Sequence, residues 1–468
     1  MNELFPPRNI RDAIDETLTC ALGNACERVK AGSVTPTFDA AAFSEQLAQF
    51  DFHRPQPFEE TLTWTIAQME CGLVHVTHPR YFGLFNPTPN YPAQCADKIT
   101  AAFNPQLATA TTSPAAVAIE AHVVASVAKR AGLPSGATGH FTTGGSEANY
   151  TAVILALAEG CPGFNEDGVR AFPGQPVFYV SEDSHLAWLK IARQAGLGLS
   201  AVNLVATDPE GCLDPEALRT AIEQDRLAGR VPVMVAATAG TTNAGMIDPL
   251  PACARIARET GLWFHVDAAW SGALIASAAR RTLLCGIELA DSVTIDAHKW
   301  FATTMGCGIF LTSHNDALHR TFRTTTGYMP STTPADPYTS SIQWSRRFAG
   351  LRLFLALAAA GWDGYARHVE HTLLLAERLK AQIVNEGWIV LNRSPVGVAC
   401  MSPGRPCSTR ALVERVLASG QAWVSVARFQ GRTVVRACIT SGLTTAADVA
   451  ILVDALVDAE KLVHLETQ

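Results

Sequence analysis

Two side chains stand where predicted strands end, and their types suit covalent and acid–base chemistry. The apolar run at residues 292–295 leads into Asp296-Ala297-His298-Lys299, so Lys299 follows the carboxyl end of a strand. The run at residues 263–266 leads in the same way into Asp267. Ligands of parallel α/β sheets bind beyond the carboxyl ends of the strands. The pattern predicts an amine and a carboxylate in one site, although either residue alone is more often solvated or a turn cap.

A glycine-rich turn supplies a third element. Residues 142–149 read Thr-Thr-Gly-Gly-Ser-Glu-Ala-Asn, a glycine pair at the start of a predicted helix, where Ser146 can cap the first turn. The free amides and the positive dipole end of a helix N-terminus attract a phosphate dianion. The turn is neither a Walker loop nor the three-glycine dinucleotide pattern. For this motif taken alone, a plain capped helix is an equally good interpretation.

Composition limits the classes of partner. The chain has 468 residues, of which 48% are hydrophobic and 17% charged, as is typical of a folded protein with a large core. Its formal net charge of −7 and its lack of long Lys/Arg runs argue against nucleic acid or an anionic membrane as a partner. The 12 scattered cysteines form no Cys-x-x-Cys pair, and the first residues lack the order of a secretory signal. We therefore expect a cytoplasmic protein with a small-molecule ligand.

Three segments differ in their patterns. Residues 1–75 look helical with proline breaks, which predicts an N-terminal arm or added layer. Residues 76–345 alternate short β-branched runs with amphipathic stretches, which predicts a mostly parallel sheet with helices on both faces. Residues 346–468 combine long helical patterns with four short strands. The expected fold class is α/β, with a large domain and a small C-terminal α+β domain.

Amine, carboxylate and phosphate cradle together match the needs of pyridoxal 5′-phosphate. Further motifs occur in order at residues 78–83, 112–115, 143–149, 184–185, 240–242, 265–269, 296–300 and 345–348. With these motifs the chain resembles the group II pyridoxal-phosphate-dependent decarboxylases, the family of aromatic-L-amino-acid, glutamate and diaminobutyrate decarboxylases. The resemblance implies fold type I, the aspartate-aminotransferase-like fold, and a homodimer with shared active sites. It also implies decarboxylation of an L-amino acid to an amine and CO₂, through an external aldimine and a quinonoid.

The resemblance also implies which residues bind the cofactor. Lys299 forms the Schiff base, and Asp267 keeps the ring nitrogen protonated. His185 stacks on the ring, and Ala269 packs on the opposite face. The other implied contacts are Gly145, Ser146, Thr241 and His298. Asp296 stands where some relatives carry asparagine, and an acid beside a phosphate is unfavourable unless it turns away or is protonated, so we expect it to act through a neighbour.

A second set of residues is implied on the substrate side. Tyr328 lies in the segment that matches the lid of the family, and it is the candidate that protonates Cα after CO₂ leaves. Arg346 matches the arginine near the substrate carboxylate. Phe85 and Asn86 border the substrate, and Phe103 reaches in from the partner chain. An aromatic substrate is favoured, because several aromatic side chains accompany these motifs.

Other kinds of chemistry are open at this stage. Two His-x-x-His pairs, at residues 75–78 and 368–371, lack a convincing third ligand, so we expect no metal. A desulfurase nucleophile would have to come from Cys212, Cys285 or Cys307, none of which has an evident activating partner. The same cofactor also supports transamination, retro-aldol cleavage and decarboxylation-linked oxidative deamination to an aldehyde. Outside enzymes, the alternative is a catalytically retired binding relative.

Overall fold

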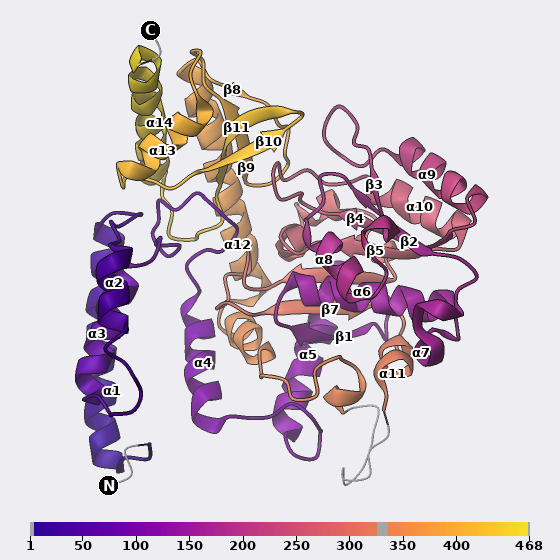
Figure 1. Ribbon diagram of the computed structural model, residues 1–468, viewed down its shortest axis with the longest axis horizontal. Coiled ribbons are helices and arrows are strands. Elements are labelled where there is room, and N and C mark those ends of the chain that lie inside the picture. Colours follow the sequence, from indigo (N-terminus) through magenta and orange to yellow (C-terminus); the bar gives the residue numbers. More distant parts are fainter. Residues whose placement is uncertain (1–3, 325–335, 467–468) are drawn as a thin grey trace.

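A seven-stranded sheet forms the centre of the computed structural model, which describes residues 4–324 and 336–466 (Figure 1). Its strands lie in the order β1 (Thr138–Thr142), β7 (Gly308–Thr312), β6 (Ser292–Asp296), β5 (Trp263–Asp267), β4 (Val231–Thr238), β2 (Pro176–Ser181) and β3 (Val202–Val205). Only β7 runs against the others in this sheet, since it is antiparallel to both β1 and β6. The carboxyl ends of β4, β5 and β6 therefore meet at one edge.

Alternating side chains of the strands supply two cores, one on each face of the sheet. In β2, Val177 and Tyr179 join one apolar cluster while Phe178 and Val180 join the other, as the two-residue period of a strand dictates. The helices of the first cluster include α5 (Pro114–Ala131), α9 (Pro215–Leu227), α10 (Leu250–Thr260) and part of α12 (Gly350–Asn385). Those of the second are α6 (Gly145–Gly160), α7 (Phe164–Asp167), α8 (Ala187–Gln194) and α11 (Ala317–Phe322). The sheet is thus buried on both faces, which explains its nearly continuous apolar strands.

A second, antiparallel sheet lies near the C-terminus. Its strands lie in the order β10 (Ser425–Phe429), β11 (Arg432–Cys438), β9 (Val398–Ser402) and β8 (Ile389–Val390). Helices α13 (Thr409–Ala418) and α14 (Ala446–Glu466) and the end of α12 (Gly350–Asn385) share its apolar core. The long α12 is interrupted at Gly361, whose φ of +63° favours glycine.

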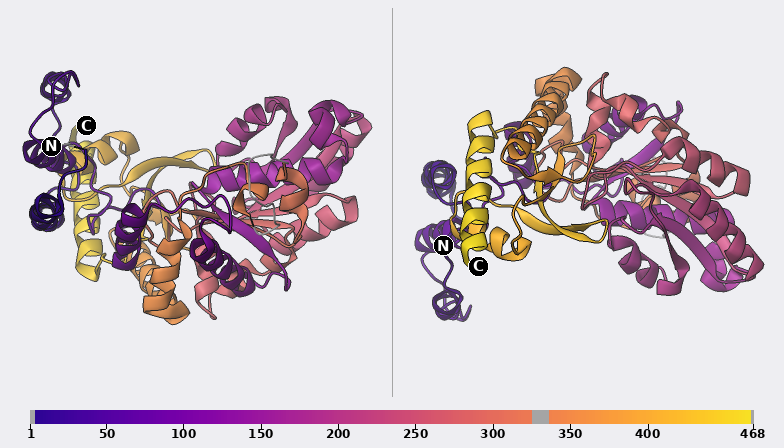
Figure 2. Two further views of the ribbon diagram at one scale, coloured as in Figure 1. Left: turned by 90° about the horizontal axis from the view of Figure 1, so that it is seen from below. Right: turned by 90° about the horizontal axis from the view of Figure 1, so that it is seen from above.

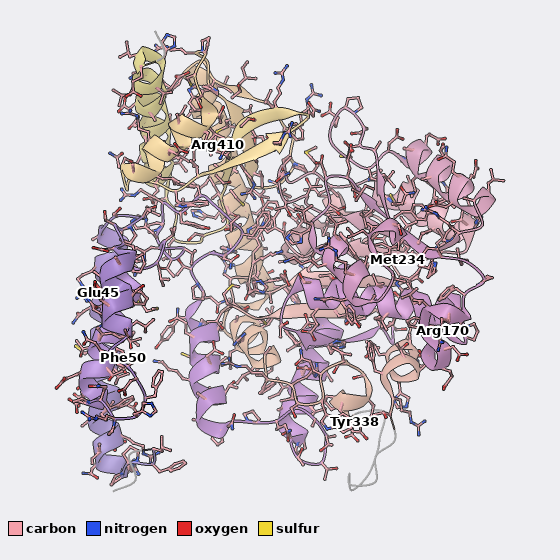
Figure 3. The ribbon with its side chains drawn as sticks, viewed as in Figure 1. Glu45, Phe50, Arg170, Met234, Tyr338 and Arg410 are labelled. Atoms are coloured by element: carbon pink, nitrogen blue, oxygen red, sulfur yellow. The ribbon has the colours of Figure 1, made fainter. Side chains whose placement is uncertain are left out.

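Three N-terminal helices stand at one side of the body: α1 (Arg8–Ala31), α2 (Ala40–Leu47) and α3 (Phe58–Cys71) (Figure 2). Figure 3 shows the contrast in surroundings, with Met234 inside the large sheet and Glu45 and Phe50 on this arm. Ala25 is the one residue of the three helices that is buried. The next helix, α4 (Tyr91–Phe103), packs against α12.

The remaining helical elements are short 3₁₀ turns. They are η1 (Gly168–Ala171), η2 (Leu199–Ala201), η3 (Ser271–Ala276), η4 (Arg281–Leu284), η5 (Ile287–Leu289) and η6 (Pro337–Thr339). In the described part of the chain, no helix has both the length and the apolar character needed to cross a membrane.

The expected fold class is confirmed, including the mostly parallel sheet and the small C-terminal sheet. Two strands were not expected from the sequence. Strand β1 was not predicted because Gly139 interrupts its apolar pattern. The glycine is needed there, since a Cβ would come within 1.9 Å of the Phe310 carbonyl oxygen. Strand β3 has only four residues and is half-exposed, so its apolar pattern is short.

Candidate active site

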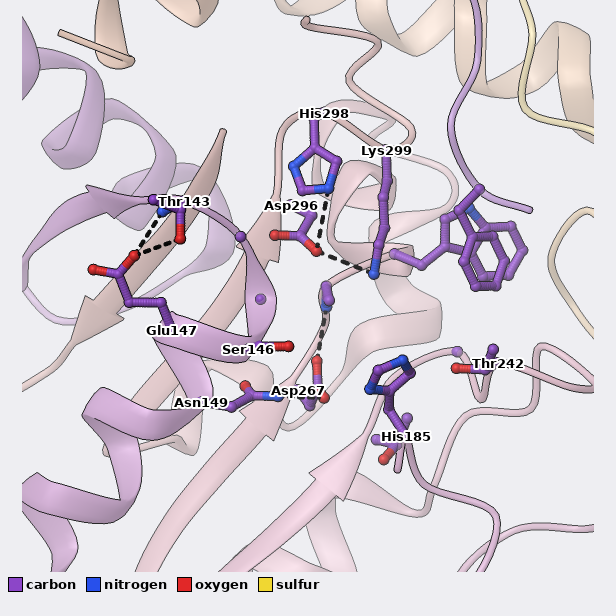
Figure 4. Close-up of a pocket in the computed structure, with 17 residues that line it drawn as sticks. Thr143, Ser146, Glu147, Asn149, His185, Thr242, Asp267, Asp296, His298 and Lys299 are labelled. Carbon is purple, nitrogen blue, oxygen red and sulfur yellow. Dashed lines mark hydrogen bonds and ion pairs between the residues drawn. The ribbon is translucent and has the colours of Figure 1, made fainter. Parts of the chain in front are cut away.

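The carboxyl ends of β5 and β6 bring the two acids of the sequence motifs into one pocket. The strands are parallel neighbours that end at Asp267 and Asp296. The turn after β6 carries His298 and Lys299 into the same space (Figure 4). The pocket has a volume of about 320 Å³. Its lining residues are Phe85, Thr143, Gly144, Gly145, Ser146, Glu147, Asn149, His185, Thr238, Gly240, Thr242, Asp267, Ala269, Trp270, Asp296, His298 and Lys299.

Asp267 is held by hydrogen bonds to both carboxylate oxygens. The Asn149 side-chain amide donates to Oδ2 at 2.8 Å, and the Ala269 backbone N–H donates to Oδ1 at 3.1 Å. Behind Asn149, the ring Nε2 of His265 lies 3.1 Å from the amide oxygen, and Nδ1 lies 2.8 Å from the Ser292 hydroxyl. Burial lowers the pKa of His265 to about 4, so the ring is neutral and its single N–H belongs on Nε2. This chain of contacts fixes the direction in which the carboxylate points.

Lys299 pairs with the other acid. Its Nζ lies 3.0 Å from Oδ2 of Asp296, and Nε2 of His298 lies 3.9 Å from the same oxygen. The opposite ring nitrogen of His298, Nδ1, lies 3.1 Å from the carbonyl oxygen of Cys307. From the sequence we expected the Lys299 amine and the Asp267 carboxylate in one site, and both line the pocket. The ammonium group pairs with Asp296, the acid three residues before it.

The N-terminus of α6 forms a wall of the pocket. The helix begins at Gly145, after Gly144, whose backbone is extended. No side chain caps the first turn with a hydrogen bond. The Ser146 side chain thus faces the pocket and does not cap the helix. A Cβ at Gly145 would come within 2.9 Å of Asp296 Oδ2 and 3.3 Å of the Ala269 Cβ. Glycine is needed because α6 begins directly against the ends of β5 and β6.

His185 lies in the turn between β2 and α8. Its Nδ1 accepts a hydrogen bond of 3.1 Å from the Ala187 backbone N–H. Burial lowers the pKa of His185, although the Asp267 carboxylate acts in the opposite direction. The ring is therefore neutral near pH 7, with its proton on Nε2. A flat, uncharged imidazole at the pocket wall is suited to stacking on a planar ligand.

The loop after β4 places Thr242, and not Thr241, at the pocket. The Thr241 side chain is buried, and its hydroxyl accepts a hydrogen bond of 3.0 Å from the Met246 backbone N–H. Gly240 turns the chain with a φ of +96°, and a Cβ there would lie 2.1 Å from the Ser271 hydroxyl. The Thr241 hydroxyl thus stabilises this turn, and Thr241 does not line the pocket.

These residues fit pyridoxal 5′-phosphate by the chemistry of the groups that they present. An amine, a braced carboxylate and a neutral imidazole line one pocket of suitable size. The backbone amides that begin α6, the Ser146 hydroxyl and the His298 ring offer donors to a phosphate group. The fold and site together define a fold type I enzyme that uses this cofactor.

Comparison with known proteins gives the family. Residues 50–400 match the profile described as pyridoxal-dependent decarboxylase conserved domain, so the chain belongs to this family of amino-acid decarboxylases, which are carboxy-lyases that use pyridoxal phosphate. The acidic amino acid decarboxylase of Bos taurus is 33% identical over 316 residues, which is 66% of this chain and 60% of that protein. The aromatic-L-amino-acid decarboxylase of Bacillus atrophaeus is 27% identical over 432 residues, which is 89% of this chain and 88% of that protein.

A solved structure extends the likeness to the whole fold. The crystal structure of mouse CSAD in its apo form has a TM-score of 0.91 at 26% identity, covering 97% of this chain and 99% of that one. The match to the Bos taurus decarboxylase spans about three fifths of that protein's length, and the two curated relatives differ in the substrate class that their names give. Family and cofactor are therefore shown, while the substrate is not.

Two of the expected substrate-side residues, Arg346 and Asn86, lie outside the pocket lining. Arg346 forms a buried ion pair of 2.6 Å with Glu120 and donates to the Phe141 carbonyl oxygen, so it does not line the pocket. Asn86 lies outside the lining and contacts the Met305 sulfur. Phe103 is 81% exposed at the end of α4. Tyr328 lies outside the described residues.

Two residues in and beside the site were missed from the sequence. Asn149 was interpreted as a first-turn residue of a capped helix, yet its amide holds Asp267. Arg436 of β11 is buried, and its guanidinium carbon lies 4.9 Å from the ring centroid of Phe85, which lines the pocket. Its Nε donates to the Thr242 carbonyl oxygen and its Nη1 to that of Gly83. A charged residue inside the apolar run at 434–438 was the available signal, because a buried arginine needs acceptors.

Proposed function

We propose that this chain decarboxylates an aromatic L-amino acid to the corresponding amine and CO₂. The observation that carries the proposal is the convergence of Lys299, Asp267 and His185 on one pocket, in a chain of the pyridoxal-dependent decarboxylase family. The cofactor, when bound, supplies the electron sink that accepts the electron pair left when the bond from Cα to the carboxylate breaks.

Each residue contributes through its own contacts. Lys299 presents the only lysine amine among the lining residues, so it is the residue that binds the cofactor aldehyde. Asp267, with both oxygens fixed, holds a proton on the ring nitrogen of the cofactor. His185 covers one ring face with a neutral imidazole, and Ala269 leaves room on the other. Gly145, Ser146 and His298 hold the phosphate.

The aromatic preference rests on an aromatic residue in the pocket lining. Phe85 lines it and stacks on Trp270, with ring centroids 4.4 Å apart and planes 24° from parallel. Trp270 in turn stacks on Trp300 at 5.2 Å. The Phe85 ring is held by this stack and presents an aromatic surface to a substrate side chain.

A second candidate substrate class is an acidic amino acid. The observation in its favour is Arg436, whose Nη2 is buried and has no hydrogen-bond partner in the described part of the chain. That nitrogen could hold a side-chain carboxylate, and the Bos taurus relative is named for acidic amino acids. We place it second because Phe85, and not Arg436, lines the pocket.

Substrate profiling with two variants separates the classes. We expect aromatic L-amino acids to release CO₂ with the highest kcat/KM. Phe85→Leu should lower that value about tenfold, since a stacking surface of about 1 kcal/mol or more is lost. Arg436→Gln removes the charge of the guanidinium group and keeps a polar side chain, so it serves as the matched variant. Preference for aspartate or glutamate, with loss of activity in Arg436→Gln and not in Phe85→Leu, would establish the acidic class.

The product is the second open point. We propose that Cα is protonated after CO₂ leaves, so that the product is the amine, and Tyr328 is our candidate donor on the strength of its match to the lid of the family. Tyr328→Phe would remove the proton donor, so aldehyde, ammonia and peroxide, formed at the cost of O₂ and water, should rise at the expense of amine. An unchanged amine-to-aldehyde ratio at an unchanged rate would exclude Tyr328. Aldehyde as the main product of the wild type would identify oxidative deamination.

The partner of this chain, we propose, is a second copy. Apolar side chains of the N-terminal arm are exposed, among them Leu22 (46%), Phe58 (61%) and Met69 (49%), as is Phe103 at the end of α4. Large apolar side chains exposed on one arm are costly in water when they gather, and such groups are typical of an interface. We expect a dimer by light scattering, and a monomeric chain that retains full activity would exclude shared sites.

The division into an arm of residues 1–75, a cofactor domain of 76–345 and a small domain of 346–468 is likewise our proposal, as is the cytoplasmic location. Limited proteolysis tests the division, because cleavage should concentrate near residues 75 and 345. Fractionation of cells tests the location.

A further inference from the structure

We propose that Asp296 competes with the phosphate group of the cofactor for His298 and the N-terminus of α6, and thereby sets how tightly the chain holds pyridoxal 5′-phosphate. This role rests on the proposed placement of that phosphate at Gly145, Ser146 and His298. In the sequence, Asp296 was only a neighbour of the phosphate residues. Its contacts in the fold indicate a separate role.

One carboxylate oxygen of Asp296 lies near an ammonium group, a histidine ring nitrogen and the N-terminus of a helix. Oδ2 lies 3.0 Å from Nζ of Lys299 and 3.9 Å from Nε2 of His298. The same oxygen lies 2.9 Å from the place of a Cβ on Gly145, the first residue of α6. The positive end of the α6 dipole therefore adds to the ammonium and imidazole groups. These are the features that bind an anion, and a protein carboxylate already contacts them.

The other oxygen makes the carboxylate a strong competitor. The Asp296 side chain is only 3% exposed, and its Oδ1 has no hydrogen-bond partner in the described part of the chain. Water therefore screens its charge poorly, and two like charges in such a site repel each other more than they would at the surface. A phosphate at the α6 N-terminus must share His298 and the first turn of α6 with Asp296 or displace the Asp296 carboxylate from them.

Replacing the acid by its amide should remove this competition. Asparagine has nearly the same shape, carries no charge, and offers an N–H that can donate to a phosphate oxygen. We expect Asp296→Asn to bind inorganic phosphate and pyridoxal 5′-phosphate at least about tenfold more tightly than the wild type. Pyridoxal, which lacks the phosphate, should bind both proteins with dissociation constants within about twofold of each other.

The matched control is a second acid of the same pocket. Glu147 also lines it, but its carboxylate is engaged by the Thr143 backbone and hydroxyl and by the Gln343 amide. Glu147→Gln removes the same charge from a group that turns to other partners. We expect it to change phosphate affinity less than about twofold.

Isothermal titration calorimetry on the full chain stripped of cofactor measures all three ligands. Tighter binding of both phosphate compounds by Asp296→Asn, with little change for pyridoxal and for Glu147→Gln, supports the proposal. Unchanged or weaker phosphate binding by Asp296→Asn overturns it. An equal increase in affinity for pyridoxal also overturns the proposal, because the Asp296 carboxylate would then act through Lys299. Asp296→Ser provides a second variant if the asparagine variant does not fold.

The readout is independent of turnover. A wild-type chain that binds pyridoxal 5′-phosphate but decarboxylates no amino acid would refute the proposed function. In that case the calorimetric difference between wild type and Asp296→Asn would still decide the role of Asp296. Absence of phosphate binding in every variant would refute both the phosphate site and the competition.

Discussion

Asp267 and Asp296 end neighbouring parallel strands, yet the fold gives the two carboxylates opposite surroundings. Asp267 has each oxygen hydrogen bonded, one by the Asn149 amide and one by the Ala269 backbone. Asp296 has one oxygen beside the Lys299 ammonium and the other without a partner among the described residues. The first is suited to holding a proton on a ligand at a fixed place, and the second to exchanging ions.

The difference shows that residue type and strand position do not decide the role of an acid. Both residues follow buried apolar strands and both stand before small residues. The neighbours that reach each carboxylate come from α6 and from the turn after β6, and these elements differ in whether they bring an amide or an ammonium group.

Removal of the amine should have the largest effect. Lys299→Ala abolishes decarboxylation and the visible absorbance of the cofactor bound to lysine, since no other lysine lines the pocket among the described residues. Absorbance spectra and CO₂ release measure this. Lys190→Ala, which changes an exposed lysine of α8, is the control and should leave both unchanged. A borohydride-trapped adduct at a different lysine would contradict the assignment.

The two acids should then separate in activity. Asp267→Asn lowers kcat by about 10²- to 10³-fold, the size of effect typical when a contact to developing charge is removed. Asp296→Asn, assayed at saturating cofactor, should lower kcat far less, because its carboxylate faces Lys299 and the phosphate side of the pocket. Circular dichroism confirms folding of each variant. Equal decreases in kcat in the two variants would show that the two acids do not differ in their contribution to catalysis.

The histidine behind Asp267 predicts a pH effect on stability. Burial lowers the pKa of His265 to about 4, whereas the unfolded chain has the ordinary value near 6.5. Between these values the unfolded state binds a proton that the folded state does not, so the free energy of unfolding decreases as the pH falls. For this group the loss is about 2 kcal/mol between pH 7 and pH 5. Urea unfolding at the two pH values measures this decrease in the free energy of unfolding. If His265→Gln shows the same decrease, other groups cause it.

The smallest expected effect concerns the brace of Asp267. Asn149→Ala removes the hydrogen bond to Oδ2 and should lower kcat about tenfold, since a hydrogen bond to a charged group contributes about 1.5 kcal/mol or more. Asn203→Ala is the control, because the Asn203 amide also donates to a carboxylate, that of Asp225, and does not line the pocket. If kcat is unchanged in Asn149→Ala, the Ala269 backbone alone orients Asp267.

Local patterns in the sequence determined the layered sheet and the residues that follow its strands. Short apolar runs locate β2, β4, β5, β6 and β7, and Asp267 and Lys299 follow two of them directly. The glycine pair before α6 is another local signal, because only glycine permits the helix to begin so close to Asp296. Strand alternation and turn chemistry act over a few residues, so the printed sequence contains them in full.

Tertiary structure alone decided which partner each charged or polar group meets. Arg346 lies within a family motif, yet the fold pairs it with Glu120, which is 226 positions away. Arg436 comes from the small domain and lies against Phe85. Thr241 and Thr242 are neighbours in the chain, and the Gly240 turn decides which of them faces the pocket. Such pairings depend on which buried groups the folded chain brings within a few ångströms, because electrostatic and hydrogen-bond energies decrease steeply with distance and desolvation makes an unpaired group costly.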